Sequence, residues 1–176
     1  MSQKKVIYWD ACIFLHLFRE TPEYIDALRH NLGQATSEEC VIATSSVTLA
    51  EVYKVPGEGV LPLDQRKLIL GFFKNPYVEM WQADRGVCEK AHYIMNDWGT
   101  LKPMDAIHVA TALAAEAHIM LTTDKKMYNR SGLLLSHDGK IDNLRIVRPT
   151  MGEFLPLWKK ENEGGGQAEA EAGQGM

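Results

Sequence analysis

The stretch from residue 104 to residue 124, MDAIHVATALAAEAHIMLTTD, constrains the fold more than any other part of the chain. From residue 105 to 117 it consists mostly of Ala, Val, Ile and Leu, with charge only at Asp105 and Glu116. A helix that is apolar nearly all round belongs inside a domain, not on its surface. The apolar run at 118–122 then reads as a short buried strand. This unit predicts an α/β sheet that displays carboxylates at its edge.

Strands and helices are expected to alternate along the rest of the chain. The strand candidates are short apolar runs, and the longest lack the polar alternation of a half-exposed strand, which is typical of a parallel, helix-covered sheet. We therefore expect an α/β fold: a three-layer α/β/α arrangement around a central parallel sheet of about five strands. The strands are expected at 6–9, 39–44, 77–81, 118–122 and 145–147, and helices at 11–20, 21–33, 45–52, 63–74, 84–98 and 105–117.

Particular residues predict the start of one helix, its end, and one loop. Thr21 and Pro22 predict a helix start, and Gly33 predicts the end of that helix. The segment 54–61 contains Pro56, Gly57 and Gly59 and predicts a loop.

Length and composition bound the domain organisation. A chain of 176 residues with 45% hydrophobic and 24% charged residues is typical of one globular domain. We expect that domain to span 1–158, and the Glu-, Gly-, Gln- and Ala-rich segment 159–176 to be a disordered tail. No apolar run approaches the roughly 18 residues of a membrane span, so we expect no membrane association and a cytoplasmic protein. Its three widely spaced cysteines predict reduced thiols, not a disulfide framework or zinc site.

Four carboxylates are expected at one edge of this sheet. Ligands of parallel α/β sheets gather beyond the carboxyl ends of the strands. Asp10 and Asp124 each follow a strand, Glu51 lies about two turns into the helix after the second strand, and Asp105 begins the buried helix. Each has a simple local explanation as a helix cap or a solvated charge. Together they would repel one another and raise their pKa values unless a cation lay among them.

The donor set indicates which cation and which chemistry. Oxygen-only ligands suit Mg²⁺ or Mn²⁺, and no Cys/His pairing competes for zinc or copper. Such an ion orients and deprotonates a water and neutralises charge on a phosphorus centre, with either one or two ions. The net charge of −4 does not by itself indicate nucleic-acid binding. Backbone contacts to RNA would come from Lys54, Lys102, Lys125, Lys126 and Arg130, with Tyr128 available to stack on a base.

The sequence also resembles a known family. The segments VIYWDACIFL, IATSSVTLAEVY, PMDAIHVATAL and IMLTTDKKM resemble, in order, the four motifs of PIN-domain ribonucleases, over residues 5–150. Three positions depart from the family pattern: Cys12 replaces a frequent Asn or Ser, and Lys126 and Met127 replace an acidic and an aromatic residue.

His108 matches a frequent position of the family, and we expect it to have a structural role and not to bind the metal. Thr122 matches the hydroxyl two residues before the last aspartate, and the resemblance implies that it supports the site by contacting a metal ligand or a water. The resemblance also implies that the catalytic and metal-binding quartet is Asp10, Glu51, Asp105 and Asp124.

The resemblance further implies a Mg²⁺- or Mn²⁺-dependent endoribonuclease, in many bacterial cases the toxin of a VapBC-type pair. It also implies a homodimer and a small antitoxin protein that inserts into the acidic groove. One alternative is a non-catalytic PIN-like module that binds RNA or a protein partner. Another is an α/β phosphotransferase with Asp10 as its nucleophile, although Cys12 stands where the haloacid-dehalogenase arrangement needs a second aspartate.

Overall fold

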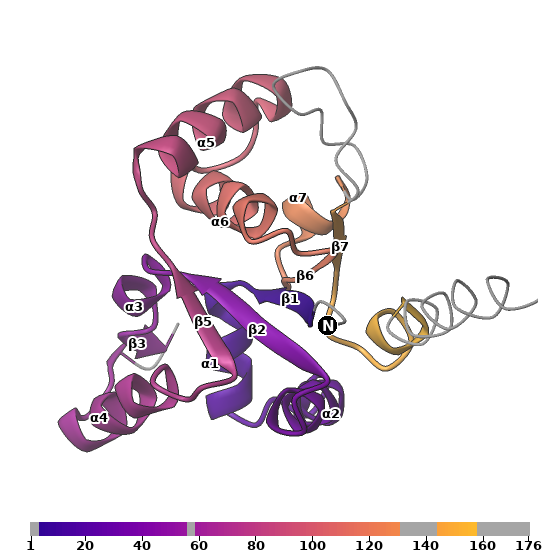
Figure 1. Ribbon diagram of the computed structural model, residues 1–176. Coiled ribbons are helices and arrows are strands. Elements are labelled where there is room, and N and C mark those ends of the chain that lie inside the picture. Colours follow the sequence, from indigo (N-terminus) through magenta and orange to yellow (C-terminus); the bar gives the residue numbers. More distant parts are fainter. Residues whose placement is uncertain (1–3, 56–58, 131–143, 158–176) are drawn as a thin grey trace, which may run out of the picture.

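A five-stranded parallel sheet forms the centre of the molecule (Figure 1). The computed structural model describes residues 4–55, 59–130 and 144–157. The strand order is β5-β2-β1-β6-β7, and every neighbouring pair is parallel. This confirms the expected α/β fold class and strand number. The strands are β1 (Lys5–Trp9), β2 (Cys40–Ser45), β5 (Val78–Trp81), β6 (Ile119–Leu121) and β7 (Arg145–Val147).

Helices cover both faces of the sheet, as Figure 1 shows. Alternating strand residues separate the two cores: Tyr8 and Met120 pack with one set of helices, whereas Ile7 and Leu121 pack with the other. The first core is closed by α5 (Arg85–Trp98) and α6 (Pro103–Ala114), and the second by α1 (Ala11–Phe18), α2 (Ile25–Thr36) and α4 (Leu63–Phe72). The helix expected from the apolar stretch is α6, which is buried among other elements.

All six expected helices are present, with bounds that differ by one to four residues at one or both ends. Helices α2 and α3 (Thr48–Glu51) differ in ways that bear on the sequence signals. Helix α2 begins at Ile25, because the backbone oxygen of Thr21 is used in a preceding turn and accepts from Tyr24 and Ile25. It also continues past Gly33 to Thr36, since Gln34 and Ala35 in its last turn are buried against the rest of the protein. Helix α3 is a single turn, so Glu51 is its last residue and does not lie two turns in.

The expected loop at 54–61 is partly wrong. It contains β3 (Lys54–Val55) and β4 (Gly59–Val60), which pair antiparallel. Gly59 has a φ of +85°, the left-handed region that glycine adopts without strain. Pro56 and Gly57 lie outside the described residues, as does the tail at 159–176, so the domain boundary at residue 158 stays a prediction.

The carboxyl edge of the sheet gathers the segments that follow β1 and β6. The backbone N–H of Asp10 donates to the Leu121 oxygen at 3.1 Å, and that of Thr122 donates to the Val147 oxygen at 3.0 Å. The short helix α7 (Lys125–Tyr128) follows β6 on the same edge. Among the described residues, no helix is long and apolar enough to cross a membrane.

Candidate active site

Asp10 is the most tightly held carboxylate of the expected quartet. It is the N-cap of α1, and its Oδ1 accepts from the Ala11 N–H at 2.7 Å. Its Oδ2 accepts from the Thr122 hydroxyl at 2.7 Å and from the Cys12 thiol at 3.2 Å. The residue is only 8% exposed. The local reading as a helix cap is therefore correct, and the same contacts fix the carboxylate at the edge of the sheet.

Glu51 reaches Asp10 through a histidine. The Nε2 atom of His108 lies 2.6 Å from Glu51 Oε2 and 3.5 Å from Asp10 Oδ1. Its Nδ1 lies 2.7 Å from the Tyr8 hydroxyl. Burial lowers the pKa of His108, but the charge of Asp10 and the hydrogen bond and charge of Glu51 outweigh burial and raise that pKa overall. His108 is thus a bridge between two of the expected carboxylates.

Asp105 lies near enough to Asp10 and Asp124 for their negative charges to interact. Asp105 lies in the first turn of α6, and its pKa is raised by loss of solvent first and then by the charges of Asp10 and Asp124. Asp124 is the N-cap of α7 and accepts from the Lys126 N–H at 2.7 Å. Its own N–H donates to the Thr122 hydroxyl oxygen at 3.1 Å. The structure therefore places all four acidic residues around one edge, with Thr122 bonded to two of the segments.

The four carboxylates offer the oxygen ligands that a hard cation prefers, but their side chains lie too far apart to hold one as they stand. Carboxylate oxygens are the ligands that Mg²⁺ and Mn²⁺ prefer, and mutual repulsion at Asp105 is the condition that such an ion relieves. Among the described residues, however, no three His, Cys, Asp or Glu side chains converge closely enough to hold an ion. Glu51, Asp105 and Asp124 are all partly exposed. Binding of an ion therefore requires the carboxylates to move closer to one another, and the charge of the ion would offset their repulsion.

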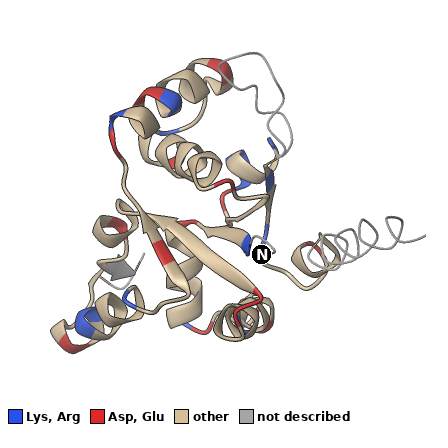
Figure 2. Cartoon of the chain, viewed as in Figure 1, with Lys and Arg blue, Asp and Glu red and all other residues tan. Residues whose placement is uncertain are grey.

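The expected RNA-contacting residues lie partly around this cluster. Lys102 is exposed, and its charge and backbone N–H both lower the pKa of Asp105. Lys125 and Lys126 are exposed on α7, directly after Asp124. Figure 2 shows acidic segments between α6 and the sheet and also on the outer helices, and basic residues on α4, α5 and β7.

Three other expected contacts are less direct. The Arg130 guanidinium lies 6.0 Å from the Trp98 ring centroid, and the Arg148 guanidinium lies 5.6 Å from that of Tyr128. Tyr128 is therefore already partnered on one face and is a weaker candidate for base stacking. The side chain of Lys54 lies outside the described part of the protein.

Sequence reasoning missed Tyr8 and the thiol contact of Cys12. Tyr8 lies two residues before Asp10, so strand periodicity places it on the face that carries the carboxylate. His108 lies one helical turn after Asp105. Those two spacings were the available signals. The pKa of Cys12 is strongly raised by burial and by the charge of Asp10, so its thiol stays protonated and donates to that carboxylate.

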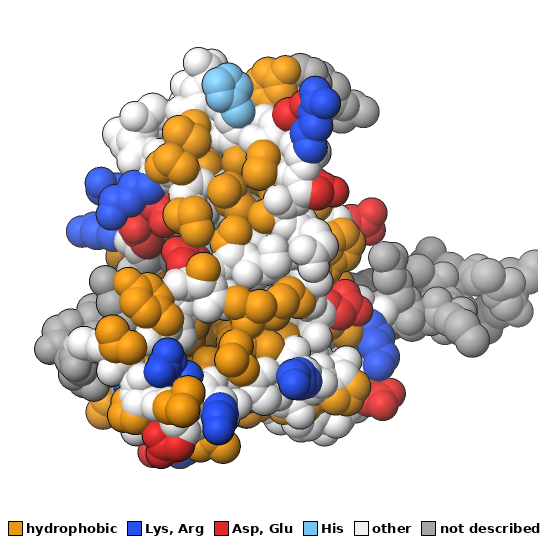
Figure 3. Space-filling view, turned by 90° about the vertical axis from the view of Figure 1, so that its left-hand side faces the viewer, with side chains coloured by type: hydrophobic (Ala, Val, Ile, Leu, Met, Phe, Trp, Pro, Cys, Tyr) orange, Lys and Arg blue, Asp and Glu red, His pale blue; other side chains and the backbone are white. Residues whose placement is uncertain are grey.

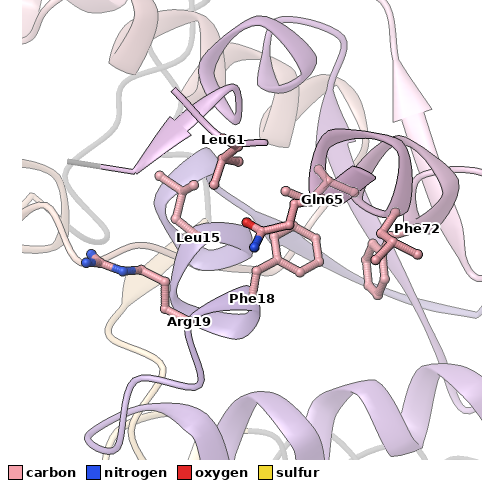
Figure 4. A pocket seen from close by; sticks show the side chains of 8 residues that line it. Leu15, Phe18, Arg19, Leu61, Gln65 and Phe72 are labelled. Carbon is pink, nitrogen blue, oxygen red and sulfur yellow. The ribbon is translucent and has the colours of Figure 1, made fainter. Parts of the chain in front are cut away.

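A separate apolar groove lies between α1 and α4 (Figure 4). It has a volume of about 590 Å³, and none of the four carboxylates lines it. Its lining residues are Leu15, Phe18, Arg19, Leu61, Gln65, Leu68, Ile69 and Phe72.

Comparisons with known proteins agree on the fold. A family model described as the PIN domain matches residues 7–133. The structure of VapBC2 from Rickettsia felis bound to a promoter DNA fragment matches with 19% identity and a TM-score of 0.55, covering 81% of this chain and 98% of that one. DNA-bound VapBC from Salmonella typhimurium matches with 20% identity and a TM-score of 0.54, covering 83% and 98%.

A toxin–antitoxin complex from Klebsiella pneumoniae matches with 18% identity and a TM-score of 0.53, covering 81% of this chain and 97% of that one. The comparison with curated proteins yields no match. At these identities the structural likeness establishes the fold alone.

Proposed function

The chain belongs to the PIN-domain family, and from this premise we propose that it is a Mg²⁺- or Mn²⁺-dependent endoribonuclease. The observation that carries the proposal is the electrostatic coupling of Asp105 to Asp10 and Asp124, three carboxylates from separate elements at the carboxyl edge of the sheet. Like charges near one another raise each other's pKa, and a cation among these carboxylates would relieve that repulsion. The residues proposed to hold the metal and support catalysis are Asp10, Glu51, Asp105 and Asp124.

The metal ion and three of the four carboxylates have the following proposed roles in cleavage. A bound Mg²⁺ or Mn²⁺ supplies an activated water and neutralises charge on the phosphodiester. Asp10 holds a fixed orientation because Thr122, Cys12 and the Ala11 N–H all donate to it. Asp105 and Asp124 bring the remaining negative charge from α6 and the β6–α7 junction.

The RNA strand is proposed to be held by its phosphates. Lys102, Lys125 and Lys126 are exposed beside these carboxylates and would contact the backbone of either a single-stranded or a structured RNA without reading its bases. We propose that the protein acts on this RNA in the cytoplasm.

The test is cleavage of RNA by matched variants. Asp10→Asn and Asp105→Asn are expected to abolish Mn²⁺-dependent cleavage while circular dichroism stays unchanged, because each removes a ligand charge and conserves shape. Asp97→Asn is the control, since Asp97 is exposed on α5. Cleavage that persists in Asp10→Asn, or that is unaffected by EDTA, contradicts the proposal.

One observation favours the alternative of a non-catalytic RNA- or protein-binding module. Within the described ranges, no three potential ligands are arranged to hold an ion. If Mn²⁺ binds, as measured by calorimetry, but a panel of structured and single-stranded RNAs is not cleaved, this alternative replaces the nuclease.

We also propose that the nuclease is the toxin of a VapBC-type pair. The similar solved structures include VapBC complexes and a further toxin–antitoxin complex, which supports an antitoxin partner for this chain. The partner is still expected to reach the acidic cluster. The apolar groove between α1 and α4, which none of the four carboxylates lines, suits a second, amphipathic segment of that partner, because Leu68 on its wall is 75% exposed. The expected observation is a neighbouring reading frame for a small DNA-binding protein that forms a complex with this chain and suppresses cleavage.

A homodimer is proposed on the side that Figure 3 views, where hydrophobic side chains gather. Exposed apolar residues of α3, β5 and α5 include Leu49, Trp81 and Tyr93. Light scattering of the isolated protein is expected to give twice the mass of one chain, and a monomeric mass contradicts this assignment.

A further inference from the structure

A buried polar layer lies beneath the acidic cluster, and the proposed nuclease chemistry does not use it directly. Tyr8, Thr44, Thr48 and His108 are each 1% exposed or less, and they come from β1, β2, α3 and α6. Buried polar groups are costly unless each finds a hydrogen-bond partner. Four such groups under one site are therefore a specific arrangement and not general core packing.

Two residues of this layer, Tyr8 and His108, form a hydrogen-bonded chain that leads to Glu51. An ionised carboxylate only accepts hydrogen bonds, so the 2.6 Å contact requires that His108 Nε2 carry a proton. In the neutral ring, Nδ1 is then an acceptor, and the Tyr8 hydroxyl at 2.7 Å is its donor. Tyr8 thereby selects the tautomer in which His108 donates to Glu51.

The other two residues of this layer hold the helix that carries Glu51. The Thr44 hydroxyl donates to the Trp9 backbone oxygen at 2.9 Å, so the Thr48 hydroxyl at 2.8 Å donates to Thr44. Thr48 is the first residue of α3 and Glu51 is the last. This one-turn helix has no side-chain cap at its N-terminus, so it depends on such tertiary contacts for its position.

We propose that Tyr8 and His108 are positioning residues that hold the Glu51 carboxylate beside Asp10. Glu51 is partly exposed and has three side-chain torsions, so without a partner it would populate several rotamers. The bond from His108 restricts it to the conformation that faces Asp10, whose Oδ1 lies 3.5 Å from the same nitrogen. This inference rests on the proposed function, because it assigns Glu51 to the metal-binding cluster.

The decisive variant is Tyr8→Phe, which removes one hydroxyl and conserves the ring. In the metal-free protein at alkaline pH, nitrogen NMR of the His108 ring is expected to change from the Nε2–H tautomer to a mixture of both. The dissociation constant for Mn²⁺, measured by calorimetry, is expected to rise by up to about tenfold, the lower end of the range for losing the direct partner of a metal ligand. The effect lies at this lower end because Tyr8 acts on Glu51 only through His108. Tyr77→Phe, at a partly buried tyrosine of the second core that contacts neither His108 nor the acidic cluster, is the matched control and should change neither.

A double-mutant cycle and a conservative variant separate positioning from general stability. In a His108→Leu background, Tyr8→Phe is expected to have no further effect on Mn²⁺ affinity, because its action passes through the ring. His108→Gln, whose amide can still donate to Glu51, should bind Mn²⁺ more tightly than His108→Leu. A folded Tyr8→Phe protein with the wild-type tautomer and affinity overturns the inference.

The two proposals fail in different ways. If wild-type protein neither binds Mn²⁺ nor cleaves RNA, the proposed function fails, and the tautomer measurement still reports on the contact. If wild-type protein binds and cleaves but Tyr8→Phe and His108→Leu behave like it, the positioning inference fails alone.

Discussion

The residues of the acidic cluster differ in how much each lowers the stability of the folded protein. Asp10 accepts three hydrogen bonds and is therefore compensated for its burial. Asp105 is not: burial raises its pKa, and the charges of Asp10 and Asp124 raise it further. A carboxyl whose pKa is higher in the folded than in the unfolded protein lowers the stability of the fold as the pH rises through the unfolded pKa, and this loss is complete above the folded pKa.

Asp105→Asn is expected to stabilise the metal-free protein while removing cleavage. Replacing a repelled charge with a neutral isostere should raise Tm by about 2–4 °C at pH 7, equivalent to about 1 kcal/mol for a domain of this size. The sign of the pKa shift predicts that the gain shrinks as the pH falls and Asp105 becomes protonated. Thermal unfolding in EDTA at several pH values measures this, and a lower Tm than wild type would contradict it.

An opposite pKa shift lies in the segment after β7. The side chain of Arg148 donates to Glu153 Oε1, and its backbone N–H donates to Oε2 at 3.2 Å. The hydrogen bond from the Arg148 side chain is the main reason that the pKa of Glu153 is lowered. A lowered carboxyl pKa contributes stability above its unfolded value, and this contribution is lost as the pH falls through the folded value.

Glu153→Gln is therefore expected to lower Tm at pH 7 and to have no effect in acid. Because both side chains are partly exposed, the loss should be only one or two degrees. The difference from wild type should shrink as the pH falls below the ordinary glutamate pKa of about 4.3. It should vanish only below the lowered pKa of the folded protein, where both states are protonated. A difference that is constant across this pH range would mean that the contact acts by packing and not by charge.

At the scale of elements, α6 connects the core to the site. Its first turn carries Asp105, its second carries His108, and its buried alanines allow close packing on the sheet and α5. Ala106 and Ala110 have no exposed surface. The helix therefore sets the distance between the sheet edge and two of the site residues.

Ala110→Leu is expected to overpack this contact and to destabilise the protein by about 1–3 kcal/mol. Ala114→Leu is the matched control, because Ala114 is an exposed residue of the same helix and leucine has nearly the helix propensity of alanine. Urea unfolding of both variants measures the difference. Equal midpoints for the two would show that α6 can move away from the sheet at little cost.

At the scale of the whole molecule, metal and fold should be coupled. The four carboxylates come from the ends of different elements, so an ion bound by them stabilises only the native state. At free Mn²⁺ about 100 times the dissociation constant, the gain is about 2.7 kcal/mol, or roughly 5–10 °C in Tm. EDTA should reverse it. Asp10→Asn is the control, and a similar gain in that variant would place the ion elsewhere.

Much of the architecture could be predicted from local patterns. The apolar runs at β1, β2 and β6 lack polar alternation because both faces of the sheet are covered, so a parallel α/β fold follows from sequence. Local signals failed where tertiary contacts outweighed them. Gly33 continues a helix because buried neighbours hold it, and the segment at 54–61 pairs with itself despite its Pro and Gly residues.

By itself, the sequence determined the fold class, the family and the four carboxylates at the edge of the sheet, because strand periodicity and motif order are local properties. Only the tertiary structure decided how those carboxylates are held. The chain Tyr8–His108–Glu51 joins residues up to 100 positions apart, and the thiol of Cys12 meets Asp10 beside Thr122. Such contacts depend on how separate elements pack, and no spacing along the chain specifies their distances.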